Sequence, residues 1–203
     1  MKKKICILDY GSGNIRSLKN SLKRIGYNCD FFSDNLKKNY DVVFIPGVGS
    51  FSKSSQLIKK PKYINFLNKI KNESFIFGIC LGMQLFMTEG EESGKSQGLN
   101  YINGNVKKLQ QIDILPLVGF QAVYFNKNSE FKFLANYSGE KFYFIHSYHV
   151  ITNSIENTIG HSKYKKIKYC VAVKKQNIFG TQFHPEKSGE IGLNFLKSYL
   201  KNV

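Results

Sequence analysis

Hydrophobic and polar positions in the first half of the chain follow two alternating patterns. Short apolar runs, typical of buried strands, alternate with stripes of hydrophobic residues spaced three or four apart, typical of one face of a helix. The runs cover residues 4–9, 27–32, 41–45 and 75–79, and the stripes cover residues 15–25, 63–70 and 81–87. Strands that alternate with helices predict an α/β fold, with a mainly parallel sheet and helices on both faces.

The second half of the chain has a different pattern. Strand-like segments follow one another with short turns, at residues 106–109, 121–125, 142–145, 169–173 and 178–182. A last amphipathic helix is marked by Ile191, Phe195 and Leu196 and is expected to end near Leu200. These segments predict additional antiparallel strands that extend the same sheet. The 203 residues show no repeat or linker, so we expect one domain over residues 1–203.

The charge and the apolar segments narrow the class of protein. The net charge is +16, but Arg16 and Arg24 are the only arginines, and the lysines are scattered along the chain. Nucleic-acid readers normally use arginine forks, so we interpret this charge as a bias towards lysine. No apolar run reaches the roughly 7–15 residues of a secretory core or the ~18 residues of a membrane span. We therefore expect a cytoplasmic protein that binds neither nucleic acid nor membranes.

Three of the four cysteines have an ordinary setting. The cysteines are far apart and form no CxxC pair, which argues against a zinc site or a disulfide framework. Cys6, Cys29 and Cys170 each lie in a strand-like apolar segment, where we expect a buried and unreactive thiol.

Cys80 stands in a pattern of its own, between an apolar strand and a helical stripe. Gly78 precedes it by two residues and Gly82 follows it by two. A sharp strand-to-helix turn strains the backbone of its central residue, and side chains at these two flanking positions would collide. Such a turn leaves the thiol at the start of a helix, where the dipole favours the thiolate, and points the amide of Leu81 towards an oxyanion. The pattern indicates a nucleophile; a buried strand-end cysteine is the alternative.

A thiol nucleophile needs a base, and His184 has the best setting for one. It follows the apolar residues 178–183, at a strand end, and precedes Pro185 and Glu186. Pro185 restricts the backbone, so Glu186 and His184 are expected on one side of an extended segment, where Glu186 would orient the imidazole. A surface turn without a catalytic role is the alternative. His161 is expected in an exposed loop, and His146 either lines the site or is structural.

These motifs together resemble a known family. The segments GICLGMQ at residues 78–84 and QFHPE at residues 182–186 resemble the class I, or triad, glutamine amidotransferases. Further segments resemble, over essentially the whole chain, the glutaminase subunit of imidazole glycerol phosphate synthase: DYGSGN at 9–14, PGVGSF at 46–51, FYFIHSY at 142–148 and QFHPEKSG at 182–189. The resemblance implies a class I glutamine amidotransferase-like fold and hydrolysis of glutamine to glutamate and ammonia, with no metal or cofactor.

The resemblance also assigns roles to single residues. It makes Cys80 the nucleophile, His184 the base and then the acid, and Glu186 the orienting carboxylate. Backbone amides of Val48 or Gly49 would join that of Leu81 as an oxyanion hole, in a loop whose peptide can turn. The residues expected to bind glutamine are Gly47, Gln84, Glu92, Ser147 and Tyr148. For Gln84 the alternative is a helix-surface residue, and for Glu92 a solvated loop residue.

A heterodimer is implied as well. In the family, a separate (β/α)8-barrel cyclase receives the ammonia and makes imidazole glycerol phosphate and aminoimidazole carboxamide ribotide for histidine biosynthesis. Asn14 and Lys187 match positions at that subunit contact. The alternatives for these two residues are an ordinary helix cap and a surface charge.

One segment departs from the family pattern. Where the family commonly has Pro-His-Met-Gly-Trp-Asn, residues 116–121 read Pro-Leu-Val-Gly-Phe-Gln. A paralogous glutaminase that supplies ammonia to another acceptor, as in amidino-sugar biosynthesis, is therefore an alternative function. A non-catalytic binding module and a general cysteine hydrolase are alternatives from other classes.

Overall fold

The computed structural model describes residues 3–32, 39–112, 114–126 and 130–203. The first half contains β1 (Ile5–Ile7), α1 (Ile15–Arg24), β2 (Cys29–Phe31), β3 (Val42–Gly47), α2 (Phe51–Ile58), α3 (Pro61–Ile70), β4 (Phe75–Cys80) and α4 (Leu81–Gln84). The second half contains β5 (Glu89–Gly90), β6 (Ser96–Gln97), β7 (Gly104–Lys108), β8 (Leu117–Phe125), β9 (Lys141–His146), β10 (Tyr148–Thr152), β11 (Thr158–Tyr164), β12 (Ile167–Lys175), β13 (Ile178–Thr181) and α5 (Gly189–Asn202). Three 3-10 helices in the described chain are η1 (Lys132–Tyr137), η2 (Ile155–Asn157) and η3 (Pro185–Lys187).

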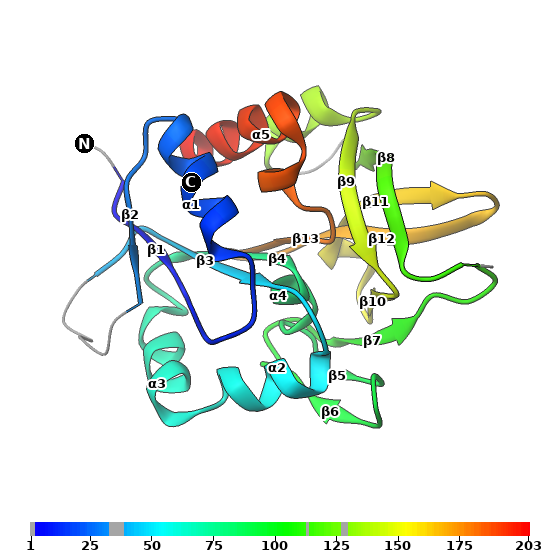
Figure 1. Ribbon diagram of the computed structural model, residues 1–203, viewed down its shortest axis with the longest axis horizontal. Coiled ribbons are helices and arrows are strands. Elements are labelled where there is room, and N and C mark those ends of the chain that lie inside the picture. The colour runs from blue at the N-terminus through cyan, green and yellow to red at the C-terminus, as the bar shows by residue number, and fades with distance from the viewer. Residues whose placement is uncertain (1–2, 33–38, 113, 127–129) are drawn as a thin grey trace.

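The main sheet joins both halves of the chain. Its strand order, over the described residues, is β2-β1-β3-β4-β13-β12-β11-β8-β9. Strands β2 to β13 in this order are parallel, and the strands from β12 onward are antiparallel. The predicted α/β fold, with a parallel part and an antiparallel extension, is confirmed. The strand expected at residues 106–109 is β7, but it does not extend the main sheet as expected. It belongs to a smaller sheet, β10-β7-β5-β6, which lies below the main sheet in Figure 1.

Helices cover both faces of the parallel strands. Helices α1 and α5 lie on one side of the sheet, and α2 and α3 lie on the other (Figure 1). Along β3 the side chains alternate: Val42 and Phe44 pack into the core under α1 and α5, while Val43 and Ile45 pack into the core against α2 and α3. Among the described helices, none is both long and apolar enough to cross a lipid bilayer.

The turn between β4 and α4 has the geometry that the glycine pattern predicts. Cys80 has φ 54° and ψ −110°, a left-handed conformation that is strained for a side chain. A Cβ at Gly82 would lie 1.7 Å from the carbonyl oxygen of Ile45, and a Cβ at Gly78 would lie 2.7 Å from the carbonyl carbon of Gly82. The turn therefore packs against the backbone of β3 at Gly82, and its two flanking glycines, Gly78 and Gly82, pack against each other.

Local structure differs from the sequence expectation in several places. Helix α4 ends at Gln84, so it has a single turn where the stripe predicted a helix to residue 87. His161 lies in β11, half-buried and stacked on Tyr124 with 5.6 Å between ring centroids, and the predicted exposed loop is wrong. Cys29 is half-buried, whereas full burial was expected.

We expect Gly82→Ala to destabilise the protein by roughly 3 kcal/mol or more, because the added methyl group would overlap the carbonyl oxygen of Ile45. Gly94→Ala is the control: unlike Gly82, Gly94 has a positive φ, but its surroundings are open, so only the backbone strain of about 1–2 kcal/mol applies. Urea unfolding of both variants measures the difference. Equal losses would contradict the close approach of the turn to β3.

Candidate active site

Three predicted side chains meet at the carboxyl ends of two neighbouring parallel strands. Cys80 ends β4, and His184 and Glu186 follow β13, which pairs with β4 in parallel. The carboxyl ends of parallel strands share one edge of the sheet, which is where α/β proteins place their sites. Both His184 and Glu186 are buried, and His184 Nδ1 lies 2.7 Å from Glu186 Oε1. The carboxylate thus fixes the orientation of the imidazole.

The charges around His184 decide its protonation. Burial alone lowers the pKa of an imidazole, but the negative charges of the Cys80 sulfur and of the Glu186 carboxylate outweigh it and raise the pKa of His184 to about 10. The ring is therefore protonated at neutral pH. Its Nε2 atom is buried and faces the Cys80 sulfur, so this is the atom available to give up a proton. Because α4 has a single turn, its dipole is small. His184 lies within electrostatic reach of the sulfur.

A buried amide chain leads away from the sulfur. Gln182 Nε2 donates a hydrogen bond to Cys80 Sγ at 3.5 Å, and Gln182 Oε1 accepts one from Gln84 Nε2 at 3.1 Å. Gln84 Nε2 also donates to the carbonyl oxygen of Tyr148 at 2.9 Å. Gln84 is therefore a buried residue of the site and not a helix-surface residue. Gln182 is not among the site residues expected from the sequence, although a residue two positions before His184 in an extended segment faces the same side.

The expected oxyanion loop lies beside Cys80. Gly47 is the register partner of Cys80 in the β3–β4 pair, and a Cβ at Gly47 would lie 2.9 Å from the Cβ of Leu81. Leu81 is the first residue of α4. Val48 and Gly49 follow in the loop before α2, where the carbonyl oxygen of Val48 accepts a hydrogen bond from Ser12 Oγ at 2.8 Å.

The expected glutamine-binding residues come from two segments near this loop. Glu92 Oε2 accepts a hydrogen bond from the backbone amide of Phe51 at 2.5 Å, at the start of α2. Burial and the nearby Glu92 carboxylate raise the pKa of Tyr148, so these two side chains lie within electrostatic reach of each other. Ser147 joins β9 to β10, and Tyr148 begins β10. Glu92 is half-buried and anchored, and the alternative of a freely solvated residue is not supported.

His146 is buried beside the site and neutral. Its Nδ1 atom donates to the carbonyl oxygen of Tyr148 at 2.9 Å, and its ring packs against Phe144 and Tyr169. Burial lowers the pKa of His146 to about 4, and the neighbouring histidines, among them His184, add to this effect. A neutral imidazole that holds a backbone carbonyl has a structural part in shaping the Ser147–Tyr148 turn.

An exposed apolar patch lies next to Cys80 on strands β8 and β9. We call Val118, Phe120, Tyr143 and Ile145 the β8–β9 patch. Val118 pairs with Ile145 and Phe120 with Tyr143, and Phe120 is 57% exposed. The carbonyl oxygen of Ile145 lies 4.0 Å from Cys80 Sγ, so the patch borders the site.

The two expected interface residues have distinct settings. Lys187 Nζ lies 5.9 Å from the ring centroid of Tyr143, at the margin of the β8–β9 patch. Asn14 is exposed and caps α1, where its side chain accepts a hydrogen bond from the Ser17 amide at 3.3 Å. The structure therefore brings Lys187 close to the site, whereas Asn14 has a role as a helix cap.

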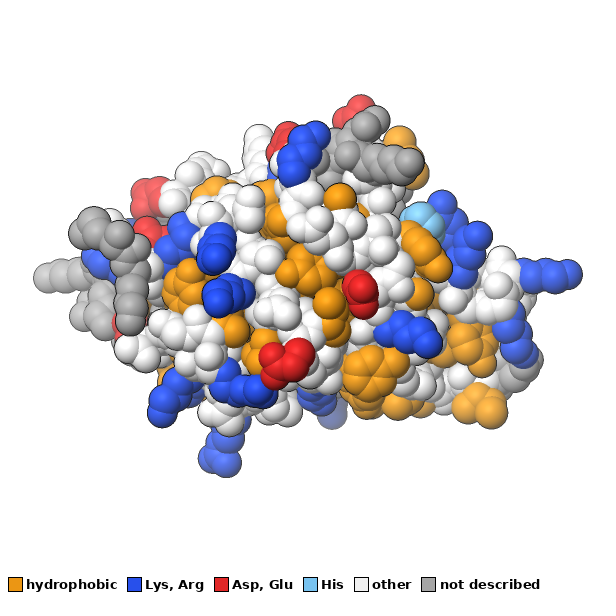
Figure 2. Space-filling model, turned by 90° about the horizontal axis from the view of Figure 1, so that it is seen from above, with side chains coloured by type: hydrophobic (Ala, Val, Ile, Leu, Met, Phe, Trp, Pro, Cys, Tyr) orange, Lys and Arg blue, Asp and Glu red, His pale blue; other side chains and the backbone are white. Residues whose placement is uncertain are grey.

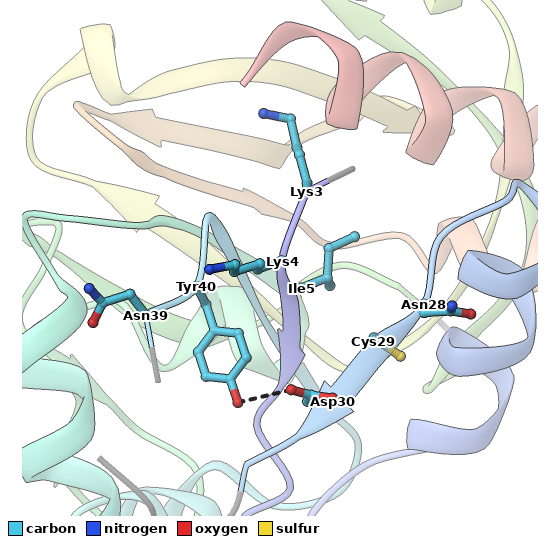
Figure 3. Close-up of a pocket in the computed structure, with 8 residues that line it drawn as sticks. All are labelled: Lys3, Lys4, Ile5, Asn28, Cys29, Asp30, Asn39 and Tyr40. Carbon is cyan, nitrogen blue, oxygen red and sulfur yellow. Dashed lines mark hydrogen bonds between the residues drawn. The ribbon is translucent and has the colours of Figure 1, made fainter. Parts of the chain in front are cut away.

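Other surface features lie away from these residues. A cavity of about 600 Å³ opens between β1, β2 and Tyr40, and Cys29 and Asp30 line it (Figure 3). Burial raises the pKa of Cys29, which keeps this thiol protonated. Within the described residues, no three His, Cys, Asp or Glu side chains gather as metal ligands. On the face shown in Figure 2, lysine and arginine side chains are spread out and do not form one basic patch.

We expect the His184 ring to remain protonated from pH 7 to about pH 9 in the wild-type protein, since its raised pKa lies near 10. In Cys80→Ser the negative charge on the sulfur is absent, so it no longer opposes the effect of burial, which lowers the pKa of His184. The ring should therefore lose its proton at a clearly lower pH. Imidazole nitrogen shifts in a pH titration of ¹⁵N-histidine-labelled protein measure both values. A wild-type ring that titrates near pH 6.5, or equal values in the two proteins, would contradict the assigned charges.

Comparison with known proteins places this arrangement in a family. A family model described as glutamine amidotransferase class-I matches residues 6–202. The chain is 37% identical to the imidazole glycerol phosphate synthase subunit HisH of Chlorobium chlorochromatii, over 96% of this chain and 98% of that protein. It is 39% identical to the HisH subunit of Buchnera aphidicola, over 97% and 98%.

Solved structures share the fold at lower identity. The structure of PurLQS from Thermotoga maritima aligns with a TM-score of 0.76 at 19% identity and covers 99% of both chains. A crystal structure of a glutamine amidotransferase aligns with a TM-score of 0.72 at 16% identity, over 98% of this chain and 99% of that chain. The fold and the sequence therefore agree, and this chain belongs to the class-I glutamine amidotransferase family.

Proposed function

We propose that this chain hydrolyses glutamine to glutamate and ammonia as the glutaminase subunit of an imidazole glycerol phosphate synthase in the cytoplasm, with residues 1–203 acting as one domain. The observation that carries the proposal is the buried set of Cys80, His184 and Glu186, with Nδ1 of the imidazole 2.7 Å from the carboxylate. The high identity to HisH subunits over nearly the whole chain supports the same function.

The reaction begins with attack of the Cys80 thiolate on the carboxamide carbon of glutamine. The oxyanion that forms is held by the amide of Leu81 and by an amide of the Val48–Gly49 segment, each worth roughly 3–4 kcal/mol in other enzymes. Protonated His184 gives its Nε2 proton to the departing amine, and ammonia leaves. A water molecule then loses a proton to His184 and cleaves the thioester, which releases glutamate and restores the thiolate.

Glutamine is proposed to lie between the oxyanion loop and the start of β10. The carboxylate of Glu92 suits the α-ammonium group, because it is half-buried and lies within electrostatic reach of the Tyr148 hydroxyl group. Gly47, Gln84, Ser147 and Tyr148 complete the proposed binding residues. Gln84 is buried and its Nε2 atom is already bonded within the protein, so it shapes this wall of the site.

The acceptor of the ammonia is proposed to be a (β/α)8-barrel cyclase subunit docked over the β8–β9 patch. Ammonia released into water would be diluted and protonated, so an acceptor has to cover the site. Val118 and Phe120 come from the altered segment at residues 116–121, and they keep an apolar surface there. Lys187 and Asn14 are the proposed polar contacts. A paralogue with another acceptor is distinguished by capture of the bound subunit from native extract and identification of the product formed with it.

Cys80→Ala is expected to abolish glutamine hydrolysis, because no other described side chain is placed to attack in its stead. Cys29→Ala is the matched control and should retain activity, since Cys29 lies in the cavity of Figure 3 and not in the site. Glutamate release is measured with purified protein and the barrel subunit, and circular dichroism checks the fold. Hydrolysis by Cys80→Ala would refute the assignment of the nucleophile.

Phe120→Lys is expected to weaken binding of the barrel cyclase subunit at least tenfold, because docking would have to bury the new charge. Ile155→Lys is the control: Ile155 is also an exposed hydrophobic residue, but it lies in η2 outside the patch. Calorimetric titration gives the dissociation constants, and partner-stimulated glutaminase activity should fall in parallel. Unchanged affinity in Phe120→Lys would show that docking uses another surface.

A further inference from the structure

The sulfur of Cys80 is buried, so the negative charge that it carries when it attacks has to be compensated within the protein. Cys80 is 5% exposed, and His184 supplies one opposite charge. A buried ion pair is stable only when further hydrogen bonds satisfy the remaining acceptor sites of the anion. Gln182 Nε2, at 3.5 Å from the sulfur, is such a donor, and Gln182 itself is fully buried.

The direction of this hydrogen bond is forced by a backbone group. The carbonyl oxygen of Tyr148 can only accept hydrogen bonds, so the Gln84 atom that contacts it at 2.9 Å has to be the amide nitrogen. The same nitrogen contacts the Gln182 side chain at 3.1 Å, so the atom it meets there has to be the carbonyl oxygen. The remaining end of the Gln182 amide, which faces Cys80, is therefore the NH2 group and can only donate.

We propose that Gln182 is a catalytic residue that holds the Cys80 sulfur in its negatively charged form, and that Gln84 orients it. The proposal rests on the proposed glutaminase function for its place in the reaction. A group that can only donate favours the thiolate over the thiol, because charge-assisted hydrogen bonds are roughly twice as strong as neutral ones. The same bond stabilises the sulfur when it leaves the thioester, so Gln182 serves both halves of the reaction.

If Gln182 had only a structural role, its hydrogen bonds would stabilise the chain at the end of β13 and would not affect the charge of the sulfur. The adjacent Thr181 provides that comparison, since it is fully buried and its Oγ1 donates to the carbonyl oxygen of Phe183 at 3.0 Å. Thr181→Val removes one buried hydrogen bond from the same strand without touching the sulfur. A structural effect would appear equally in Thr181→Val and in Gln182→Met, whereas an effect on the sulfur would appear only in Gln182→Met.

The test measures the reaction of Cys80 with iodoacetamide without glutamine, and mass spectrometry identifies the labelled peptide. We expect Gln182→Met, which keeps the length of the side chain, to slow labelling at pH 7 by about tenfold and to move the pH profile of labelling to higher pH. Thr181→Val should stay within about twofold of wild type, on the same energy scale. Equal rates in Gln182→Met and wild type, or equal slowing in both variants, would overturn the proposal.

Two further measurements separate this proposal from the function on which it rests. Glutaminase activity with the partner subunit should fall about tenfold in kcat for Gln182→Met, with KM little changed. If the wild-type protein hydrolysed no glutamine but labelling still depended on Gln182, the proposed function would fail and the role of Gln182 at the sulfur would stand. Should Gln182→Met not fold, Gln84→Met tests the same chain, and labelling as fast as in wild type would overturn the proposal.

Discussion

The active site depends on how closely the turn after β4 approaches the backbone of β3. Gly82 has no side chain, so its backbone rests against the carbonyl oxygen of Ile45, and this leaves Cys80 in a left-handed conformation. That conformation costs a residue with a side chain about 1–2 kcal/mol. The strain is held by a buried parallel sheet, packed on both faces, in which β3 and β4 cannot move apart. The position of the sulfur is therefore set by the core.

The same sheet determines the charges that the site can hold. Because β13 pairs with β4 in parallel, its continuation brings Gln182, His184 and Glu186 to the edge where the sulfur lies. Each buried charge there has a partner: Glu186 contacts the imidazole, and both the imidazole and the Gln182 amide face the sulfur. Electrostatic interactions between such partners are strong in a site of low polarity, and the positions of the partners are fixed before a substrate binds.

Local patterns revealed the parts of the site that lie close together in the sequence. The glycines around Cys80 and the run from His184 to Glu186 could be interpreted because their geometry depends on a few adjacent residues. Contacts over long sequence separations could not be deduced in this way. The amide chain joins Gln182 to Gln84, and the Glu92 carboxylate holds the start of α2, so both depend on strand order and register. His161 was misplaced for the same reason, since β11 is defined by its partners β8 and β12.

The β8–β9 patch is physically connected to the catalytic segment as well as near it. The backbone of Tyr143, in the centre of the patch, accepts a hydrogen bond from the amide of His184 at 2.9 Å. The amide of Tyr143 donates to Ser188 Oγ at 3.0 Å, and Ser188 Oγ in turn donates to the carbonyl oxygen of His184 at 2.6 Å. The proposed docking surface around Phe120 and Tyr143 therefore lies on a strand that is hydrogen-bonded at two points to the segment that carries His184. The proposed docking surface and the proposed catalytic residues therefore share this strand, because β9 is both the edge of the sheet and the support of His184.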